Sequence, residues 1–344
     1  MSRRRDDGAG GSARRPGAAA ERGRGHVPSK PVGPMHPRAR ERRFRRPVAA
    51  AGRRGRARSN LRAVTTPAPR LPAVLSIAGS DSGGGAGIQA DLKAFAACGV
   101  HGMTAITAIT AQSTVGVDAI GAVEPELIVA QVRAVQRDIG VDAVKIGMLG
   151  TLATIAAVEC ALDELEPGTP IVLDPVMVSE SGAELLVEEA RTALVERLLP
   201  RVTVATPNLP EARAIAGAPD ADAPELARAI RALGPRCVVV TGGHRERAVD
   251  VFYDGETLAE IPGERFPDGA AHGSGCTHSS ALAAHLAHGF TPLEAARAAK
   301  RLAARAVRDG LREIGRGAGP VDALGIRANR PRRDASSENP SAGT

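Results

Sequence analysis

Short apolar segments alternate with amphipathic segments along the chain from residue 71 onward. Between the apolar runs, hydrophobic residues recur at helical spacing, as in Ile88, Leu92 and Phe95, and Gly99 ends that helix. Continuous apolar runs without polar alternation predict strands that are buried on both faces. They lie at residues 72–79, 103–110, 141–147, 170–177, 202–206 and 236–241. The pattern therefore predicts an α/β protein with a mainly parallel central sheet between two layers of helices.

One segment departs from this alternation. Residues 248–262 hold two alternating runs joined by Asp254-Gly255, a dipeptide preferred in tight hairpin turns, so they predict an antiparallel hairpin at the edge of the sheet. Two helices follow it. The first begins in the stretch HGSGC and ends near His288, and the second begins at Thr291 with a capping box.

Glycine-rich, proline-rich and polar stretches follow the predicted strands rather than precede them. They read GSDSGGG, AQST, KIGM, DPVM, TPNLPE, TGGH and HGSGC. Ligands of open α/β sheets bind outside the carboxyl ends of the strands. We therefore expect one site at this edge of the sheet.

Charge divides the chain into unlike parts. Residues 1–70 hold 19 arginines and one lysine against four acids, a net charge of +16. Because the whole chain carries +7, residues 71–344 sum to −9. The basic segment has no apolar periodicity, so we expect a disordered extension at 1–70, a single domain at 71–326 and a disordered tail at 327–344. An acidic domain lacks the basic face that nucleic-acid binding requires, so we expect none for the domain.

Cysteine spacing and hydropathy bear on the compartment. Four cysteines are far apart in the sequence, which argues against a zinc site or a disulfide framework and is typical of a reducing compartment. No apolar stretch approaches the roughly 20 residues that span a bilayer. We therefore expect a cytoplasmic protein without membrane contact.

The stretch HGSGCTHSS at 272–280 is the first candidate site. Gly273 and Gly275 let the backbone turn tightly at a helix start, where free N–H groups and the helix dipole favour an anion. Such an anion hole, which includes Ser274, suits the charge on a transferring phosphoryl group. Cys276 lies in the first helical turn, where we expect its thiol pKa to fall below ~8.5. The alternative is a helix start packed against a strand, with Cys276 as a small filler.

The stretch TPNLPEA at 206–212 is the second candidate. Asn208 and Glu211 lie three residues apart at a helix start and project to one side. Taken alone, the pair predicts a helix cap with an acid in the first turn. Beside phosphates, the carboxylate would instead bind Mg²⁺, usually through water.

Taken together, these stretches resemble the ribokinase-like superfamily, and within it the hydroxymethylpyrimidine/phosphomethylpyrimidine kinases of thiamine biosynthesis. The resemblance rests on AGSDSGGGAGIQADLKAF, KIGML, VLDPVMVSESG, VTVATPNLPEA, GGH, HGSGCT and GAGPV, in this order between residues 74 and 322. It implies a three-layer α/β/α fold with a mainly parallel sheet and an antiparallel edge hairpin. It also implies ATP as co-substrate, Mg²⁺, and a homodimer as one assembly.

The resemblance implies a role for each candidate residue. The glycine-rich turn at 79–87 would lie on the substrate side, and the GSGC anion hole would hold phosphate with Gly273, Ser274, Gly275 and Cys276. Glu211 would bind Mg²⁺. The pyrimidine would contact Gly79, Asp91, Gln112, Met148 and Val176, and the nucleotide would contact Asn208, Thr241, Gly243 and His272.

The implied reaction is in-line attack on the γ-phosphate of ATP, first by the hydroxymethyl oxygen and then by the phosphate oxygen of the monophosphate. Cys276 could assist deprotonation in the first step, so we expect Cys276→Ala to slow that step more. Thr241 and Arg316 stand where the family often has lysine and histidine, which changes the charge near the nucleotide. The alternatives are a pyridoxal or pyridoxine kinase and a catalytically inactive pyrimidine-binding protein.

Overall fold

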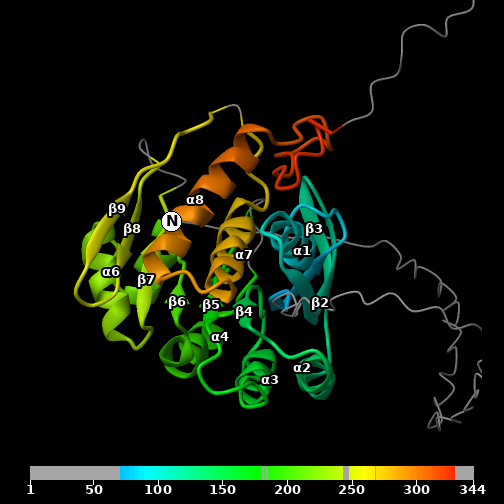
Figure 1. The fold of residues 1–344 in the computed structure, drawn as a ribbon, viewed down its shortest axis with the longest axis vertical. Coiled ribbons are helices and arrows are strands. Elements are labelled where there is room, and N and C mark those ends of the chain that lie inside the picture. The colour runs from blue at the N-terminus through cyan, green and yellow to red at the C-terminus, as the bar shows by residue number, and fades with distance from the viewer. Residues whose placement is uncertain (1–69, 180–181, 183–184, 243–247, 268, 330–344) are drawn as a thin grey trace, which may run out of the picture. The chain divides into compact units, whose positions relative to one another are not determined.

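The computed structural model describes residues 70–179, 182, 185–242, 248–267 and 269–329 (Figure 1). Arg70 makes a bidentate ion pair with Asp142, with both N–O distances at 2.6 Å. The segments expected to be disordered, 1–70 and 327–344, lie outside the described residues except for Arg70 and 327–329, and Gly243 also lies outside them.

A single mixed sheet is at the centre of the described residues. Its strand order is β3-β2-β1-β4-β5-β6-β7-β8-β9, and neighbours from β2 to β7 are parallel. The strands are β1 (Ala73–Asp81), β2 (His101–Ser113), β3 (Gly116–Ala122), β4 (Ala143–Ile146), β5 (Ile171–Leu173), β6 (Val204–Ala205), β7 (Cys237–Val240), β8 (Asp250–Tyr253) and β9 (Leu258–Ile261).

Antiparallel strands occur at both edges of this sheet. The predicted hairpin is present as β8 and β9, with β8 antiparallel to β7. The sequence did not predict β3, which pairs antiparallel with β2. Most residues of β3 are exposed, and its sequence GVDAIGA has no apolar face to bury. Pairing with β2 therefore determines this strand, not its own pattern.

Helices cover both faces of the sheet, as predicted (Figure 1). Aliphatic side chains of the strands pack against one helical layer in each of two core clusters. One layer comprises α1 (Gly87–Ala97), α7 (Ser274–Ala287) and α8 (Pro292–Arg308). The other comprises α2 (Pro125–Asp138), α3 (Leu152–Leu162), α4 (Glu188–Ala193), α5 (Leu209–Ala216) and α6 (Ala223–Ala232).

Helices α7 and α8 pack closely through small alanine side chains. The facing surfaces of these helices bury small side chains, which let two helix backbones approach closely. The residues include Ala281, Ala284, Ala295, Ala296 and Ala299. This packing fixes α7, the helix that begins at the predicted anion hole.

The direction of the chain reverses beside β1. It proceeds from β1 to β2 and β3 on one side, and then crosses to β4 on the other side of β1. Ligands of such sheets bind at this switch point. The pairing of β1 with β2 shifts register between Ala78 and Ser80, just before the glycine-rich turn.

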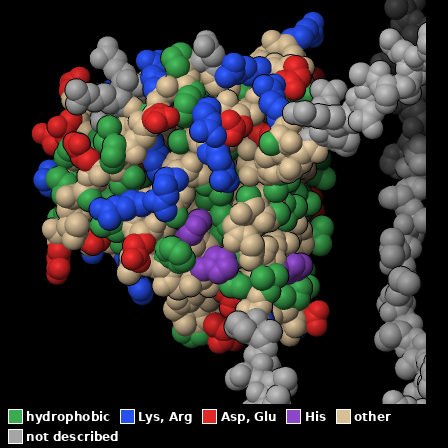
Figure 2. Space-filling view, turned by 45° about the horizontal axis from the view of Figure 1, so that its top comes forward, with side chains coloured by type: hydrophobic (Ala, Val, Ile, Leu, Met, Phe, Trp, Pro, Cys, Tyr) green, Lys and Arg blue, Asp and Glu red, His purple; other side chains and the backbone are tan. Residues whose placement is uncertain are grey.

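Surface charges are mixed on the face in Figure 2, where basic and acidic side chains are interspersed. Among the described helices, none combines the length and the apolar character needed to cross a bilayer.

Candidate active site

A cavity of about 390 Å³ lies at the carboxyl ends of the parallel strands. It collects every predicted site residue that the structure describes, apart from Asp91. These residues are Gly79, Gln112, Met148, Val176, Asn208, Glu211, Thr241, His272, Gly273, Ser274, Gly275 and Cys276. Segments almost 200 residues apart in the sequence therefore line a single cavity.

The side chain of Asp81, the last residue of β1, accepts hydrogen bonds from the glycine-rich turn that follows it. Asp81 accepts hydrogen bonds from the backbone N–H groups of Gly83, Gly85 and Ala86 at 2.8, 2.9 and 2.8 Å. His272 Nε2 lies 3.2 Å from Asp81 Oδ2. Burial alone would raise the pKa of Asp81, but His272 and these N–H groups hold it below its usual value. The turn is thus an ordered wall of the cavity, in which Asp81 already accepts from the N–H groups of Gly83, Gly84, Gly85 and Ala86.

The GSGC loop packs backbone to backbone against that turn. Gly273 has φ +83°, and a Cβ there would overlap the carbonyl oxygen of Gly85. The Ser274 N–H donates to Ala271, whereas no described residue accepts from the N–H groups of Gly275 and Cys276. These two N–H groups at the start of α7 are therefore available to bind an anion at the cavity, as the predicted anion hole requires.

The pKa of the Cys276 thiol differs from the value that the sequence predicted. Burial, together with Asp91 and Asp174, raises the pKa of its thiol to about 12, although Lys145 acts in the opposite direction. The expectation of a lowered thiol pKa is therefore wrong, because burial outweighs the helix start. At neutral pH the side chain is a protonated thiol.

The predicted substrate side combines an amide with apolar groups. Gln112 Oε1 accepts a hydrogen bond from Thr110 Oγ1 at 3.2 Å, which holds the side chain at the cavity wall. The Met148 carbonyl accepts a hydrogen bond from Thr107 Oγ1 at 2.8 Å. The Met148 thioether lies against Gly79, where an added Cβ would be only 2.6 Å from Met148 Cε. An amide edge beside a thioether suits a flat, polar-edged ring.

An acidic pair lies between the two ends of the cavity. Burial and the charge of Asp174 raise the pKa of Glu211 to about 8. Burial also raises the pKa of Asp174, while Lys145 and a hydrogen bond from Ser279 (2.9 Å) oppose that rise. Asn208 and Glu211 form the predicted capping box of α5. Two buried, mutually repelling carboxyl groups are a donor set that fits Mg²⁺.

Asp91 does not reach the cavity. Its carboxylate is fully buried and binds Lys145 Nζ at 2.8 and 3.0 Å, Ser76 Oγ at 2.6 Å and Ser280 Oγ at 2.7 Å. The expected contact between Asp91 and the pyrimidine is thus not supported, because Asp91 does not line the cavity and its carboxylate binds Lys145, Ser76 and Ser280. Lys145 forms part of the cavity floor.

The predicted nucleotide end is organised around Asp250. Asp250 Oδ1 accepts from the Gly242 N–H at 2.8 Å and from Lys300 Nζ at 2.6 Å, and Oδ2 lies 3.4 Å from His278 Nε2. The Thr241 N–H donates to Pro207 at 2.8 Å, which ties this turn to the start of α5. A lysine on α8 thus brings a positive charge beside the turn where Thr241 brings none.

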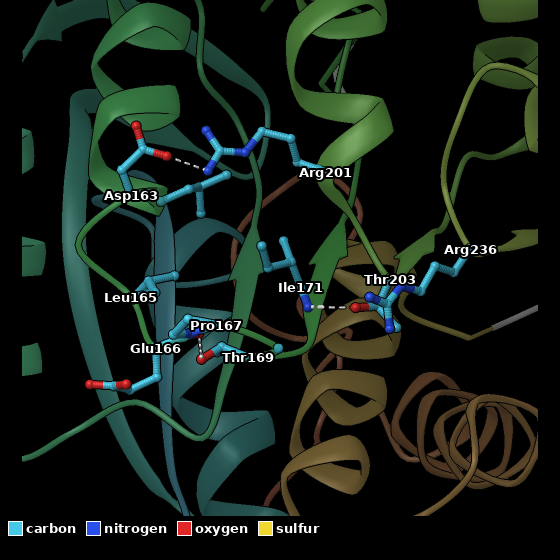
Figure 3. Close-up of a pocket in the computed structure, with 11 residues that line it drawn as sticks. Asp163, Leu165, Glu166, Pro167, Thr169, Ile171, Arg201, Thr203 and Arg236 are labelled. Carbon is cyan, nitrogen blue, oxygen red and sulfur yellow. Dashed lines mark hydrogen bonds and ion pairs between the residues drawn. The ribbon is translucent and has the colours of Figure 1, made fainter.

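A second cavity, of about 360 Å³, lies at the opposite edge of the sheet, before β5, β6 and β7 (Figure 3). Its polar groups pair with one another: Arg201 with Asp163 at 2.6 Å, and Thr203 Oγ1 with the Ile171 N–H at 3.1 Å. Ion pairs of this kind serve to join the segments that flank the strands.

Sequence reasoning missed several ionisable residues of the main cavity, namely Lys145, Asp174, Asp250, His278 and Lys300. Lys145 lies in a strand that reads as apolar, and Asp174 directly follows one. A lone charge inside a buried strand would have been the signal, because such a residue needs a partner. The partner of Lys145, Asp91, is 54 positions away in the sequence.

Comparison with known proteins gives a consistent picture. The family model described as phosphomethylpyrimidine kinase matches residues 81–322. A hydroxymethylpyrimidine/phosphomethylpyrimidine kinase of Rhizobium meliloti is 51% identical over 256 residues, covering 72% of this chain and 95% of that protein. The thiamine biosynthesis bifunctional protein ThiED of Geobacter sulfurreducens is 44% identical over 261 residues, covering 74% of this chain and 53% of that protein.

Among solved structures, an ADP complex of Bacillus subtilis pyridoxal kinase superimposes with a TM-score of 0.68. It is 39% identical, and the match covers 75% of this chain and 99% of that one.

Proposed function

The chain belongs to the phosphomethylpyrimidine kinase family, and from this premise we propose that it phosphorylates hydroxymethylpyrimidine and then the resulting monophosphate in thiamine biosynthesis. It is a phosphotransferase with ATP as the phosphoryl donor. The observation that carries the proposal is the pair of N–H donors of Gly275 and Cys276 at the cavity, where the start of α7 favours an anion.

The two ends of the cavity suit the two substrates. Gln112, Met148 and Val176 would receive the pyrimidine, since an amide offers both donors and an acceptor to an aminopyrimidine edge. Thr241 and Asn208 lie side by side where β7 ends and α5 begins, and they would receive the nucleotide together with His272, which lies against Asp81 of the glycine-rich turn. The transferring phosphoryl group would then lie against Gly273, Ser274, Gly275 and Cys276.

Glu211 and Asp174 would hold Mg²⁺. The ion neutralises charge on the phosphate oxygens when it is bound. The supporting observation is the raised pKa of Glu211, since a divalent cation would relieve the repulsion between these two carboxyl groups. Asn208 keeps Glu211 in place through the capping box, with both hydrogen bonds at 2.9 Å.

In each step the substrate oxygen forms a bond to the γ-phosphorus, the bond from that phosphorus to the β–γ bridging oxygen breaks, and ADP leaves. In the first step the hydroxymethyl group also loses its proton, which passes to water, whereas the phosphate oxygen of the second step is already ionised. The chain contributes mainly position and charge: the α7 start binds the equatorial oxygens, and the walls of the cavity orient the nucleophile. We also propose a cytoplasmic location, since the four cysteines are free thiols. The homodimer stays a prediction.

The test is a steady-state assay of the full chain with ATP and Mg²⁺ on hydroxymethylpyrimidine, its monophosphate and pyridoxal, with products identified by mass. Formation of the diphosphate from the monophosphate would support the proposal, because a pyridoxal kinase does not need that step. The likeness to the Bacillus subtilis enzyme makes pyridoxal kinase the second candidate, which turnover of pyridoxal alone would favour. Binding without turnover would favour an inactive pyrimidine-binding protein.

A further inference from the structure

A buried ion pair between Asp91 and Lys145 lies at the floor of the cavity, with Lys145 on the cavity side. Neither the Asp91 nor the Lys145 side chain has any exposed surface. The pair connects four elements, since Asp91 belongs to α1, Lys145 to β4, and the two serines that donate to Asp91 to β1 and α7. The serine on α7 is Ser280, one turn beyond the anion hole.

Stability alone does not account for this pair. Removing two charges from water is costly, and well-packed apolar residues of similar volume are often as stabilising as a buried ion pair. Burial alone would lower the pKa of Lys145, but the carboxyl groups of Asp91 and Asp174 raise it above its usual value. The contacts of Lys145 Nζ with Asp91, at 2.8 and 3.0 Å, thus favour the charged form of the lysine.

The pair has a definite orientation. Lys145 forms part of the cavity floor, whereas Asp91 lies behind it, away from the cavity. Gly147 leaves room for the ammonium group, since a Cβ at that position would lie 2.8 Å from Nζ. The result is a buried dipole whose positive end faces the cavity beside Cys276 and Asp174.

We propose that Lys145, held by Asp91, is a positioning residue for phosphoryl transfer. Its positive charge adds to the positive potential at the start of α7. Asp91 holds that helix in position by accepting a hydrogen bond from Ser280. Both effects stabilise the negative charge that develops on the oxygens of the transferring group, where a fixed dipole in a dry site acts strongly. This inference rests on the proposed function, because it concerns the same reaction.

The test uses a paired substitution. Lys145→Met alone would leave a buried carboxylate without a partner, and such a variant can fail to fold. Asp91→Asn combined with Lys145→Met removes both charges, keeps the net charge of the protein, and leaves an amide that can still bond Ser76 and Ser280. We expect this variant to keep its unfolding midpoint and its KM for the pyrimidine. Its kcat should fall roughly tenfold or more, and equally in both phosphorylation steps.

A matched control replaces an ion pair elsewhere. Arg133 and Glu164 pair at 2.6 Å between α2 and the segment after α3, and neither lines the cavity. Arg133→Met with Glu164→Gln should leave kcat unchanged. Unchanged kcat in the Asp91/Lys145 variant would overturn the inference. A higher KM together with a lower unfolding midpoint would also overturn it, because the pair would then have a structural role only. The comparison uses kcat ratios with any substrate that the wild type accepts, so it stays separate from the pyrimidine assignment.

Discussion

Glu211 carries the most readily tested ionisation in the molecule. Burial and the neighbouring Asp174 raise its pKa to about 8, so the folded protein holds this proton more tightly than the unfolded chain does. Its contribution to stability is complete below the unfolded value of about 4.5. That contribution is lost as the pH rises to about 8.

Without Mg²⁺, we expect the wild type to lose stability between pH 5 and 8 as Glu211 ionises. We predict that the Glu211→Gln variant loses less stability over the same pH range, because glutamine does not ionise. The difference from the wild type should reach roughly 2–4 kcal/mol, since each pKa unit corresponds to about 1.4 kcal/mol. Glutamine can still complete the capping box with Asn208. Denaturant unfolding at several pH values measures this, and identical pH profiles for the two proteins would contradict it.

Cys276 gives a second prediction at this scale. A thiol with a pKa of about 12 is protonated at pH 7, so a base role would first require formation of the thiolate, at roughly 7 kcal/mol. As a weak donor, the thiol would contact the transferring phosphoryl group alike in both steps. We expect Cys276→Ala to slow both steps by a similar factor of less than about tenfold, below the usual effect of a general base.

Single-turnover assays of the two phosphorylations check this expectation. A selective loss of the first step would instead restore the base role that the sequence suggested. Cys276→Ser serves as the control, because it keeps a donor of similar size.

Individual residues also mark what the sequence could not predict. Motif spacing brought Gln112, Glu211 and the GSGC loop to one cavity, because the carboxyl ends of parallel strands share one edge. The family resemblance implied that Asp91 contacts the substrate, and the helix start predicted a low pKa for Cys276; the structure supports neither, because both depend on burial. Burial is determined by segments that are far apart in the chain, and no local pattern reports it.

At the scale of elements, the two ends of α7 are a natural comparison. Gly273 precedes the helix and Gly289 follows it, with φ of +83° and +85°. A Cβ at Gly273 would overlap the Gly85 carbonyl oxygen, whereas a Cβ at Gly289 would have no atom within 4 Å. The same substitution therefore tests strain alone at one end and strain plus overlap at the other.

We predict that Gly289→Ala costs about 1 kcal/mol of stability, the usual cost of a left-handed backbone for alanine, and leaves kcat unchanged. Gly273→Ala should cost more stability and lower kcat/KM at least ~100-fold, because it displaces the anion hole. Thermal unfolding and steady-state kinetics of both variants decide this. Equal kinetics in the two variants would mean that the loop geometry does not matter for catalysis.

Elements with their own hydrophobic pattern were predictable, and the others were not. The buried strands and the helices α2, α3 and α8 have continuous runs, stripes or caps that local physics determines. The strand β3 has neither, since Gly116, Gly121 and exposed side chains leave no face to bury. It forms because β2 extends beyond the core and offers an unpaired edge.

At the scale of the whole molecule, the distribution of charge separates the first 69 residues from the rest. The face in Figure 2 carries basic and acidic side chains interspersed, whereas residues 1–70 carry a net charge of +16. Arg70 belongs with the domain, because its ion pair with Asp142 and its bond to the Ile139 carbonyl at 2.8 Å secure the chain just before β1. The boundary for a truncation therefore lies between residues 69 and 70.

We predict that removing residues 1–69 changes kcat and KM by less than about twofold, because every residue that lines the cavity lies beyond residue 78. Any affinity of the full chain for polynucleotides should disappear, since phosphate neutralisation requires the clustered arginines. Steady-state assays and a salt-dependent binding titration of both proteins measure this. A second truncation that also removes Arg70 controls for the boundary and should cost about 1 kcal/mol or less, the usual value of an exposed ion pair. If polynucleotide binding survived the first truncation, the domain itself would hold a basic site. If activity were lost instead, the N-terminal segment would contribute to the cavity.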